Sequence, residues 1–161
     1  MDERPPPEAD ESLDQLTRHW WVYQLKRGHR FSTDDVVTAW TAGMARPDAR
    51  MLVDIGAGIG SVGLMTLHFM GPEARTIFVE AQEVSHRLCR KSIDANRLGD
   101  RVELRLGDLR EEAVIPESAA FDLVTGSPPY TPVDKGVVSP HPQRAACRME
   151  LRGSVLSLIH I

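Results

Sequence analysis

Two short segments of this 161-residue chain carry residue types and spacings that suit chemistry. The first is a glycine cluster, Gly56-Ala57-Gly58-Ile59-Gly60, between an apolar run and a helix-like stretch. Glycine has no Cβ, so the backbone can turn tightly there or approach a ligand closely. A helix that starts at such a turn offers free N–H groups to a ligand. The segment therefore predicts a loop that binds a nucleotide-like cofactor, in preference to a plain tight turn.

The glycines alone leave the identity of that cofactor open. Residues 58–63 also fit the GxGxxG pattern of dinucleotide-binding proteins. Glu80 ends the next apolar run, at the spacing expected of an acid that binds ribose hydroxyls. A nicotinamide- or flavin-dependent oxidoreductase therefore remains an alternative at this point.

The second segment is Gly126-Ser127-Pro128-Pro129-Tyr130, which follows another apolar run. The prolines fix the backbone and supply no N–H, so the Ser127 hydroxyl and the Pro128 carbonyl are available to accept the two hydrogens of an amine. Tyr130 offers a flat face on which a planar substrate can stack. These residue types would suit the orientation of a planar amine, and the family resemblance given below implies group transfer to an exocyclic or amide nitrogen, with orientation as the main source of catalysis.

The surrounding sequence must bring these two segments together. Short apolar runs at residues 51–55, 76–80, 102–106 and 121–125 predict strands. Residues 61–70, 84–98 and 144–159 predict helices, and Ser32-Thr33-Asp34-Asp35 resembles a helix start after a hairpin or extended lead-in. The alternation predicts an α/β fold with a Rossmann-like, doubly wound, mostly parallel sheet. Both chemical segments follow strands, so they should meet at the crevice where the strands end.

A family resemblance narrows the cofactor and the reaction. Asp54 lies two residues before the first glycine, and the resulting Asp-x-Gly-x-Gly-x-Gly frame resembles motif I of class I S-adenosylmethionine-dependent methyltransferases. Residues 127–130 resemble the (Asn/Asp/Ser)-Pro-Pro-(Tyr/Phe) motif of amino-methyltransferases, with serine in place of the commoner acid or amide. Together with residues 31–35, the stretch from about 23 to 153 resembles the bacterial tRNA(Val) adenine-N6 methyltransferase family.

The resemblance implies S-adenosyl-L-methionine as cofactor and RNA, a tRNA adenine above all, as substrate. A release-factor glutamine or a ribosomal guanine remains an alternative target, because those enzymes share the motif order. The implied cofactor-binding residues are Thr33, Asp34, Asp54, Gly56, Gly58, Gly60, Glu80 and Asp108. The implied catalytic residues are Ser127, Pro128, Pro129 and Tyr130, and the residues expected to meet RNA phosphates are Arg144, Arg148 and Arg152. No metal is expected.

Charge and composition set the remaining expectations. The net charge is −4, but residues 1–14 hold six acids and one base, so the rest is close to neutral and RNA binding is not excluded. We expect an acidic, Pro-rich, disordered tail over residues 1–16 and a cofactor-binding part over residues 17–161. The two cysteines match no metal spacing, and no secretory or membrane signal is visible, which predicts reduced thiols in a cytoplasmic protein.

The number of predicted strands is the last expectation. The methyltransferase sheet that the chain resembles has seven strands, and four are visible here. We therefore expect a sheet truncated after the run at 121–125, with that strand as an open edge. An inactive cofactor-binding fragment is accordingly a further alternative to an enzyme.

Overall fold

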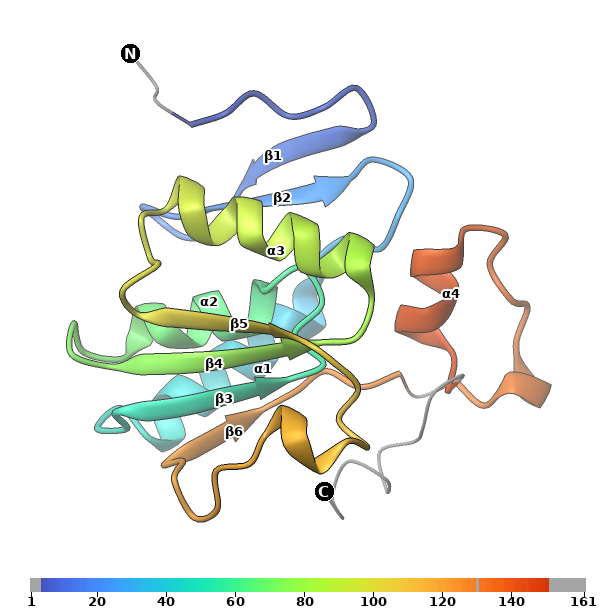
Figure 1. Cartoon of the computed structure of the whole chain (residues 1–161). Helices are drawn as coiled ribbons and strands as arrows, with labels where there is room; N and C mark the ends of the chain where they lie inside the picture. The colour runs from blue at the N-terminus through green and yellow to red at the C-terminus, as the bar shows by residue number, and fades with distance from the viewer. Residues whose placement is uncertain (1–3, 130, 151–161) are drawn as a thin grey trace.

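The structure is a computed structural model that describes residues 4–129 and 131–150 (Figure 1). An antiparallel hairpin comes first, and then strands and helices alternate. The strands are β1 (Glu11–Gln15), β2 (Trp21–Leu25), β3 (Met51–Ile55), β4 (Arg75–Glu80), β5 (Val102–Leu106) and β6 (Leu123–Thr125). The helices are α1 (Thr33–Ala45), α2 (Ser61–Phe69), α3 (Glu83–Ala95) and α4 (Pro142–Arg148), with short 3-10 turns η1 (Glu112–Val114) and η2 (Val133–Lys135).

A four-stranded sheet forms the centre of the molecule, in the order β5-β4-β3-β6. Each neighbouring pair is parallel, with Val53 opposite both Ile77 of β4 and Val124 of β6. The chain moves outward from β3 to β5 and then crosses back to β6 on the other side of β3. This reversal creates a switch point between β3 and β6, where ligands bind in open α/β sheets. The predicted fold class is therefore confirmed.

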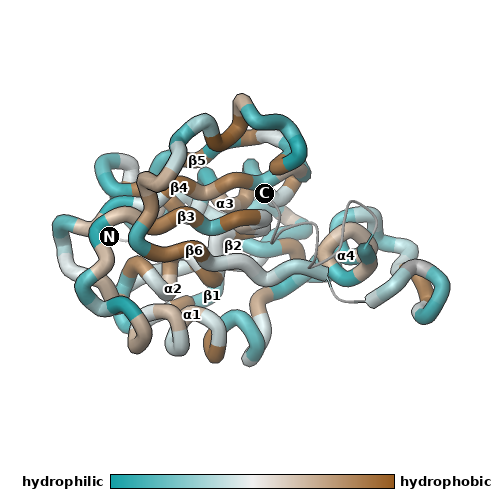
Figure 2. The backbone as a smooth tube through the Cα atoms, turned by 90° about the horizontal axis from the view of Figure 1, so that it is seen from below, coloured by the Kyte–Doolittle hydropathy of each residue, from teal (hydrophilic) through white to brown (hydrophobic). Residues whose placement is uncertain are grey.

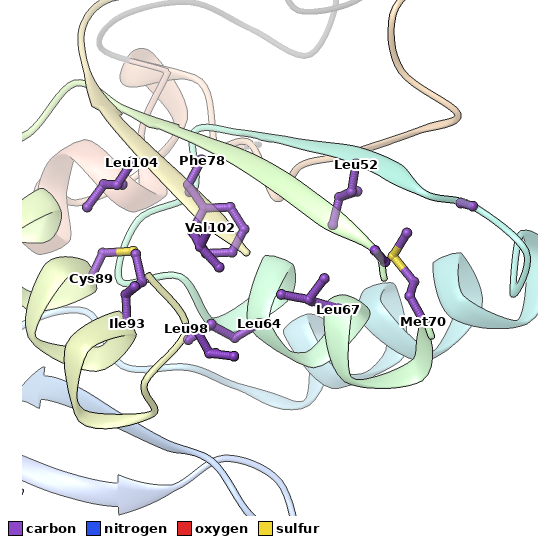
Figure 3. Close-up of a cluster of buried hydrophobic side chains, with 13 residues drawn as sticks. Leu52, Leu64, Leu67, Met70, Phe78, Cys89, Ile93, Leu98, Val102 and Leu104 are labelled. Carbon is purple, nitrogen blue, oxygen red and sulfur yellow. The ribbon is translucent and has the colours of Figure 1, made fainter. Parts of the chain in front are cut away.

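One face of the sheet carries the main core (Figure 3). Leu52, Phe78 and Val102 of the strands pack against Leu64 of α2 and Ile93 of α3. Continuous apolar strands of this kind are expected where a parallel sheet is covered by helices. This core fixes α2 and α3 beneath the strands, and so fixes the loops that lead from strand to helix.

The opposite face is covered by the segment between β5 and β6. Val53, Ile77 and Val79 pack there against Leu109 and Phe121. Figure 2 shows the central strands as hydrophobic along most of their length, in agreement with cover on both faces. The first residues of the segment between β5 and β6 also line the pocket described below.

The hairpin corrects one expectation. Residues 11–15, predicted to lie in a disordered tail, form β1 and pair with β2. The hairpin lies against α3, on the side away from the sheet (Figure 1). Glu11 is fully buried, with ion pairs to Arg87 and Lys91 of α3. The acidic composition was misleading because these two bases compensate the buried charge.

The last described helix is shorter than expected, and the final strand has an open edge. α4 covers residues 142–148, whereas the sequence predicted a helix over 144–159, of which residues 151–159 lie outside the described part. Among the described strands, β6 has β3 as its neighbour on one side and none on the other, and its Val124 is exposed. None of the helices in the described ranges has the length and apolar character needed to cross a bilayer.

Candidate functional site

A pocket lies at the carboxyl ends of β3, β4 and β6. The glycine loop, Glu80, Asp108 and residues 127–129 line it together, although they are far apart in the chain. The segment between β2 and α1 contributes His29, and the first turn of α1 contributes Asp35. Helix α4 contributes Ala146 and Cys147. The structure thus brings the two predicted chemical segments to one crevice, at the switch point that the strand order creates.

The glycine loop has a backbone that glycine adopts most easily. Gly56, Gly58 and Gly60 have φ angles of 68°, 59° and 86°. A Cβ added at Gly56 or Gly58 would meet nothing within 4 Å, whereas one at Gly60 would lie 2.8 Å from the Cys89 sulfur. The first two glycines therefore border open space, and the third is required by packing. Helix α2 starts immediately afterwards, at Ser61.

Asp54 is fully buried beneath this loop. Its Oδ1 accepts a hydrogen bond from the Thr125 hydroxyl at 2.8 Å, and its Oδ2 accepts one from the Gly63 N–H at 2.9 Å. Burial raises the pKa of Asp54 to about 7, although both hydrogen bonds oppose the shift, and Asp35 and Glu80 add to it. Asp54 therefore ties β3 to β6 and to α2, and these bonds place the glycine loop.

Glu80 and Asp108 stand at the ends of β4 and β5. The Glu80 carboxylate accepts hydrogen bonds from the N–H groups of Gly58, at 2.8 Å, and Gln82, at 2.7 Å. Asp108 forms an ion pair with Arg110, which also lines the pocket. Both predicted acids thus lie in the pocket, and Glu80 in addition holds the glycine loop.

The proline segment forms the opposite side of the pocket. Ser127, Pro128 and Pro129 line it, and Tyr130 lies outside the described residues. A Cβ at Gly126 would lie 3.0 Å from the Ile55 carbonyl oxygen, so the ends of β6 and β3 approach each other closely. That approach brings the proline segment beside the glycine loop.

The residue that the start of α1 places in the pocket is not one of the two that were expected there. Thr33 and Asp34 are exposed and do not line the pocket, whereas Asp35 is buried and does. Asp35 Oδ2 accepts hydrogen bonds from the Ser61 hydroxyl and the Ser32 N–H. The Ser32-x-x-Asp35 spacing of a capping box was visible in the sequence and is the signal that could have selected Asp35.

His29 is a second pocket residue that sequence reasoning missed. Burial lowers its pKa, the charges of Arg148 and Arg144 act in the same direction, and Asp35 opposes them. Its backbone N–H donates to the buried Gln143 Oε1 at 2.9 Å, and Gln143 Nε2 donates to the Ser85 hydroxyl at 3.1 Å. No sequence pattern indicated this contact, because 114 residues separate its partners.

Two of the predicted phosphate-binding arginines, Arg144 and Arg148, lie on α4. The Arg144 guanidinium donates two hydrogen bonds to the Gly28 carbonyl. These bonds attach α4 to the segment between β2 and α1. Arg148 is exposed, and its charge acts on the His29 imidazole; Arg152 lies outside the described residues. Arg144 thus has a structural role in addition to any contact with a substrate.

Comparisons with known proteins agree with this geometry. A family model described as Methyltransferase small domain matches residues 32–141. A tRNA1(Val) (adenine(37)-N6)-methyltransferase of Phocaeicola vulgatus is 26% identical over an alignment of 151 positions, and the match covers 89% of this chain and 60% of that protein. The chain therefore spans 60% of the length of that relative, which is less than two thirds.

Two solved structures share the fold. Transferase PH0793 from Pyrococcus horikoshii superposes with a TM-score of 0.59 at 17% identity, over 87% of this chain and 49% of the other. An O-methyltransferase from Bacillus cereus, solved in complex with SAH, has a TM-score of 0.51 at 21% identity, over 62% of this chain and 46% of the other. At these identities the likeness concerns the fold alone.

Proposed function

This chain belongs to the methyltransferase small domain family, and on that premise we propose that it binds S-adenosylmethionine and methylates an amino nitrogen, in RNA above all. The observation that carries the proposal is the meeting of the glycine loop and residues 127–129 in one pocket. One segment suits a nucleoside cofactor and the other suits an amine. An oxidoreductase would have no use for the proline segment.

The residues of the pocket fit this cofactor. Gly56 and Gly58 present backbone without side chains to open space, so a ligand can approach the loop closely. Glu80 stands where ribose hydroxyls can donate to a carboxylate, and Asp108 stands at the end of the neighbouring strand. The pocket is rich in acids, which suits a cofactor that carries positive charge on its sulfur and its amino group.

The transfer itself requires mainly orientation. The cofactor, when bound, would supply a methyl group to a nitrogen lone pair. The new carbon–nitrogen bond would replace the carbon–sulfur bond, S-adenosylhomocysteine would leave, and the nitrogen would lose one proton to water. The Ser127 hydroxyl and the Pro128 carbonyl accept the amine hydrogens and so direct that lone pair. Pro129 offers no N–H that would compete for the position, and Tyr130 stacks on the planar substrate. Fixed polar groups of this kind act without a strong general base.

An adenine in tRNA is the substrate that we favour. The relative from Phocaeicola vulgatus carries that activity in its name, and it aligns with 89% of this chain. An adenine presents an exocyclic amine and a flat ring, which match the proline segment and Tyr130. RNA bases that enter such pockets come from single-stranded loops, where they can be splayed out. Arg148, beside the pocket, is available to a phosphate, and Arg152 is a further candidate.

Calorimetric titration with S-adenosylhomocysteine, and separately with NAD, tests the cofactor assignment. We expect S-adenosylhomocysteine to bind and NAD not to bind. Gly58→Asp should weaken that binding by at least about 100-fold, or about 3 kcal/mol, since it puts a charged side chain into the open space beside the loop. Gly71→Asp is the matched control, because Gly71 also borders open space but lies outside the pocket.

The substrate is tested by methyl transfer from labelled cofactor. Unmodified tRNA should accept label at adenine N6, and Pro128→Ala should reduce the rate with little change in cofactor binding. Binding of NAD in place of S-adenosylhomocysteine would replace the proposal with an oxidoreductase. Label in a release-factor peptide or in ribosomal RNA, with none in tRNA, would move the substrate to glutamine or guanine.

A further inference from the structure

The segment between β2 and α1 brings basic side chains to the edge of the pocket. His29 lines the pocket. Lys26 and Arg27 shortly precede it in the chain, and both are exposed. The Lys26 ammonium donates to the Ala9 carbonyl at 2.8 Å, and the Arg27 side chain has no hydrogen bond or ion pair with any residue in the ranges 4–129 and 131–150. Because a carbonyl is uncharged, both bases keep their positive charge at this edge.

Helix α4 adds two bases to the same edge. The Arg144 guanidinium donates two hydrogen bonds to the carbonyl of Gly28, which lies between Arg27 and His29 in the chain. Arg148 is exposed, and no ion pair joins it to another described residue. Burial lowers the pKa of His29, and the charges of Arg148 and Arg144 lower it further, so both guanidinium groups act on that pocket residue. Two segments 116 residues apart in the chain therefore contribute to one basic surface.

Asp14 and Asp35 lie near this surface but do not neutralise it. Asp14 forms an ion pair with Arg30 at 3.2 Å, so Arg30 is not counted among the surface bases. Asp35 is buried at the start of α1, where it accepts a hydrogen bond from the Ser61 hydroxyl. Within the described part of the chain, four bases of this surface have no carboxylate partner, and we call them the basic rim: Lys26, Arg27, Arg144 and Arg148.

The basic rim suits a nucleic-acid backbone better than a single small anion. Lys26 is held toward the hairpin at Ala9, whereas Arg148 lies in the last turn of α4, so the charges do not converge on one point. A nucleic acid carries a negative charge at every nucleotide, and arginine and lysine contacts to those charges fix its position. An acidic peptide would also offer negative charges. A nucleotide, in addition, joins its phosphate to a planar base of the kind that Pro128 and Pro129 are proposed to receive.

We propose that the basic rim binds the phosphate backbone of the RNA strand whose base enters the pocket. This inference rests on the proposed function, because it describes how the substrate of the same pocket is held. It adds Lys26 and Arg27, which no sequence motif indicated, to the arginines of α4. Because Arg144 attaches α4 at Gly28, the two halves of the rim stand side by side only while that attachment holds.

Binding of unmodified tRNA, measured by fluorescence anisotropy with S-adenosylhomocysteine present and at several salt concentrations, tests the rim. Arg27→Gln and Arg148→Gln each remove one exposed charge and leave the bonds between Arg144 and Gly28 in place. Each should reduce the slope of log affinity against log salt by about 0.7 to 1, and the double variant should bind tRNA about 10-fold more weakly. Arg18→Gln should change neither quantity, because Arg18 is an exposed, unpaired base in the described part of the chain that lies outside the pocket.

Each other result has a distinct meaning. If the two rim variants bind tRNA with the affinity and salt slope of wild type, the basic rim is refuted while the proposed function stands. An equal loss in Arg18→Gln would mean that total charge attracts the RNA, which also overturns the inference. If wild-type protein binds S-adenosylhomocysteine but not tRNA, the inference fails and the cofactor assignment stands; if it binds neither, both fail. Thermal unfolding of each variant establishes that the compared proteins are folded.

Discussion

The two walls of the pocket are held in different ways. The inner wall consists of residues 54–60 with Glu80, and it is fixed by buried hydrogen bonds between strands, helix and loop. The outer wall consists of residues 127–129 and α4, which stands apart from the sheet in Figure 1. α4 is attached by side-chain contacts from Gln143 and Arg144 to residues 28, 29 and 85.

This difference separates cofactor binding, to which the inner wall contributes, from substrate positioning, to which the outer wall contributes. The inner wall belongs to the sheet and its main core, so its geometry should persist as long as the fold persists. The outer wall depends on a few contacts between distant parts of the chain, so it should open at a lower free energy than the whole molecule. We therefore expect cofactor binding to be robust and substrate positioning to be sensitive.

The largest expected effect concerns Asp54 at the base of the inner wall. Burial raises the folded pKa to about 7 from an ordinary 3.8, so the folded protein holds this proton more tightly than the unfolded chain does. The protonated Asp54 carboxyl therefore stabilises the folded state fully below about pH 4, and this stabilisation is lost as the pH rises to about 7. Relative to Asp54→Asn, wild type should lose about 4 kcal/mol of unfolding free energy over that interval.

Urea unfolding of both proteins at several pH values measures this difference. The difference should become constant above about pH 8, where Asp54 is ionised in both states. Acids that do not interact with Asp54 titrate equally in both proteins, so their contributions cancel in the comparison; Asp35 and Glu80, which add to the shift of the Asp54 pKa, are the exceptions. If the difference in unfolding free energy between the two proteins does not vary between pH 4 and pH 7, the pKa of Asp54 is not raised in the folded protein.

The second effect concerns the packing of α2 under the same wall. A Cβ at Gly63 would lie 2.3 Å from a Phe78 ring carbon and 2.8 Å from Asp54 Oδ2. Gly63→Ala should therefore lower the unfolding free energy by about 2 to 3 kcal/mol and should weaken cofactor binding. Thermal and urea unfolding measure the loss. Gly71→Ala, where a Cβ meets nothing within 4 Å, should change stability little; equal losses in both variants would contradict the close packing.

The smallest effect concerns the outer wall. Gln143→Ala removes the hydrogen bonds to the His29 N–H and the Ser85 hydroxyl. Amide hydrogen exchange in residues 142–148 should accelerate about tenfold, which corresponds to a local loss of about 1.4 kcal/mol. The affinity for S-adenosylhomocysteine should stay close to that of wild type, with Lys135→Ala as an exposed control. A matching loss of cofactor affinity would mean that the two walls are not independent.

Much of the architecture was predictable from the sequence. The glycine loop, the four sheet strands and the helix starts were predicted near their observed positions, because periodicity and turn residues are local signals. The meeting of residues 56–60 with residues 127–129 followed from the rule that parallel strands end at a common edge. The hairpin at β1 was mispredicted because an acidic composition does not reveal the bases of α3 that pair with Glu11.

By itself, the sequence determined the fold class, the family and the two segments that form the pocket, because each is encoded by neighbouring residues. Only the tertiary structure decided which acid of the α1 start enters the pocket, which carboxylates the protein already satisfies and what attaches α4. Those outcomes depend on helix rotation and on hydrogen bonds between residues such as His29 and Gln143. Burial makes such distant pairings decisive, because a polar group removed from water must find its partner wherever the fold provides one.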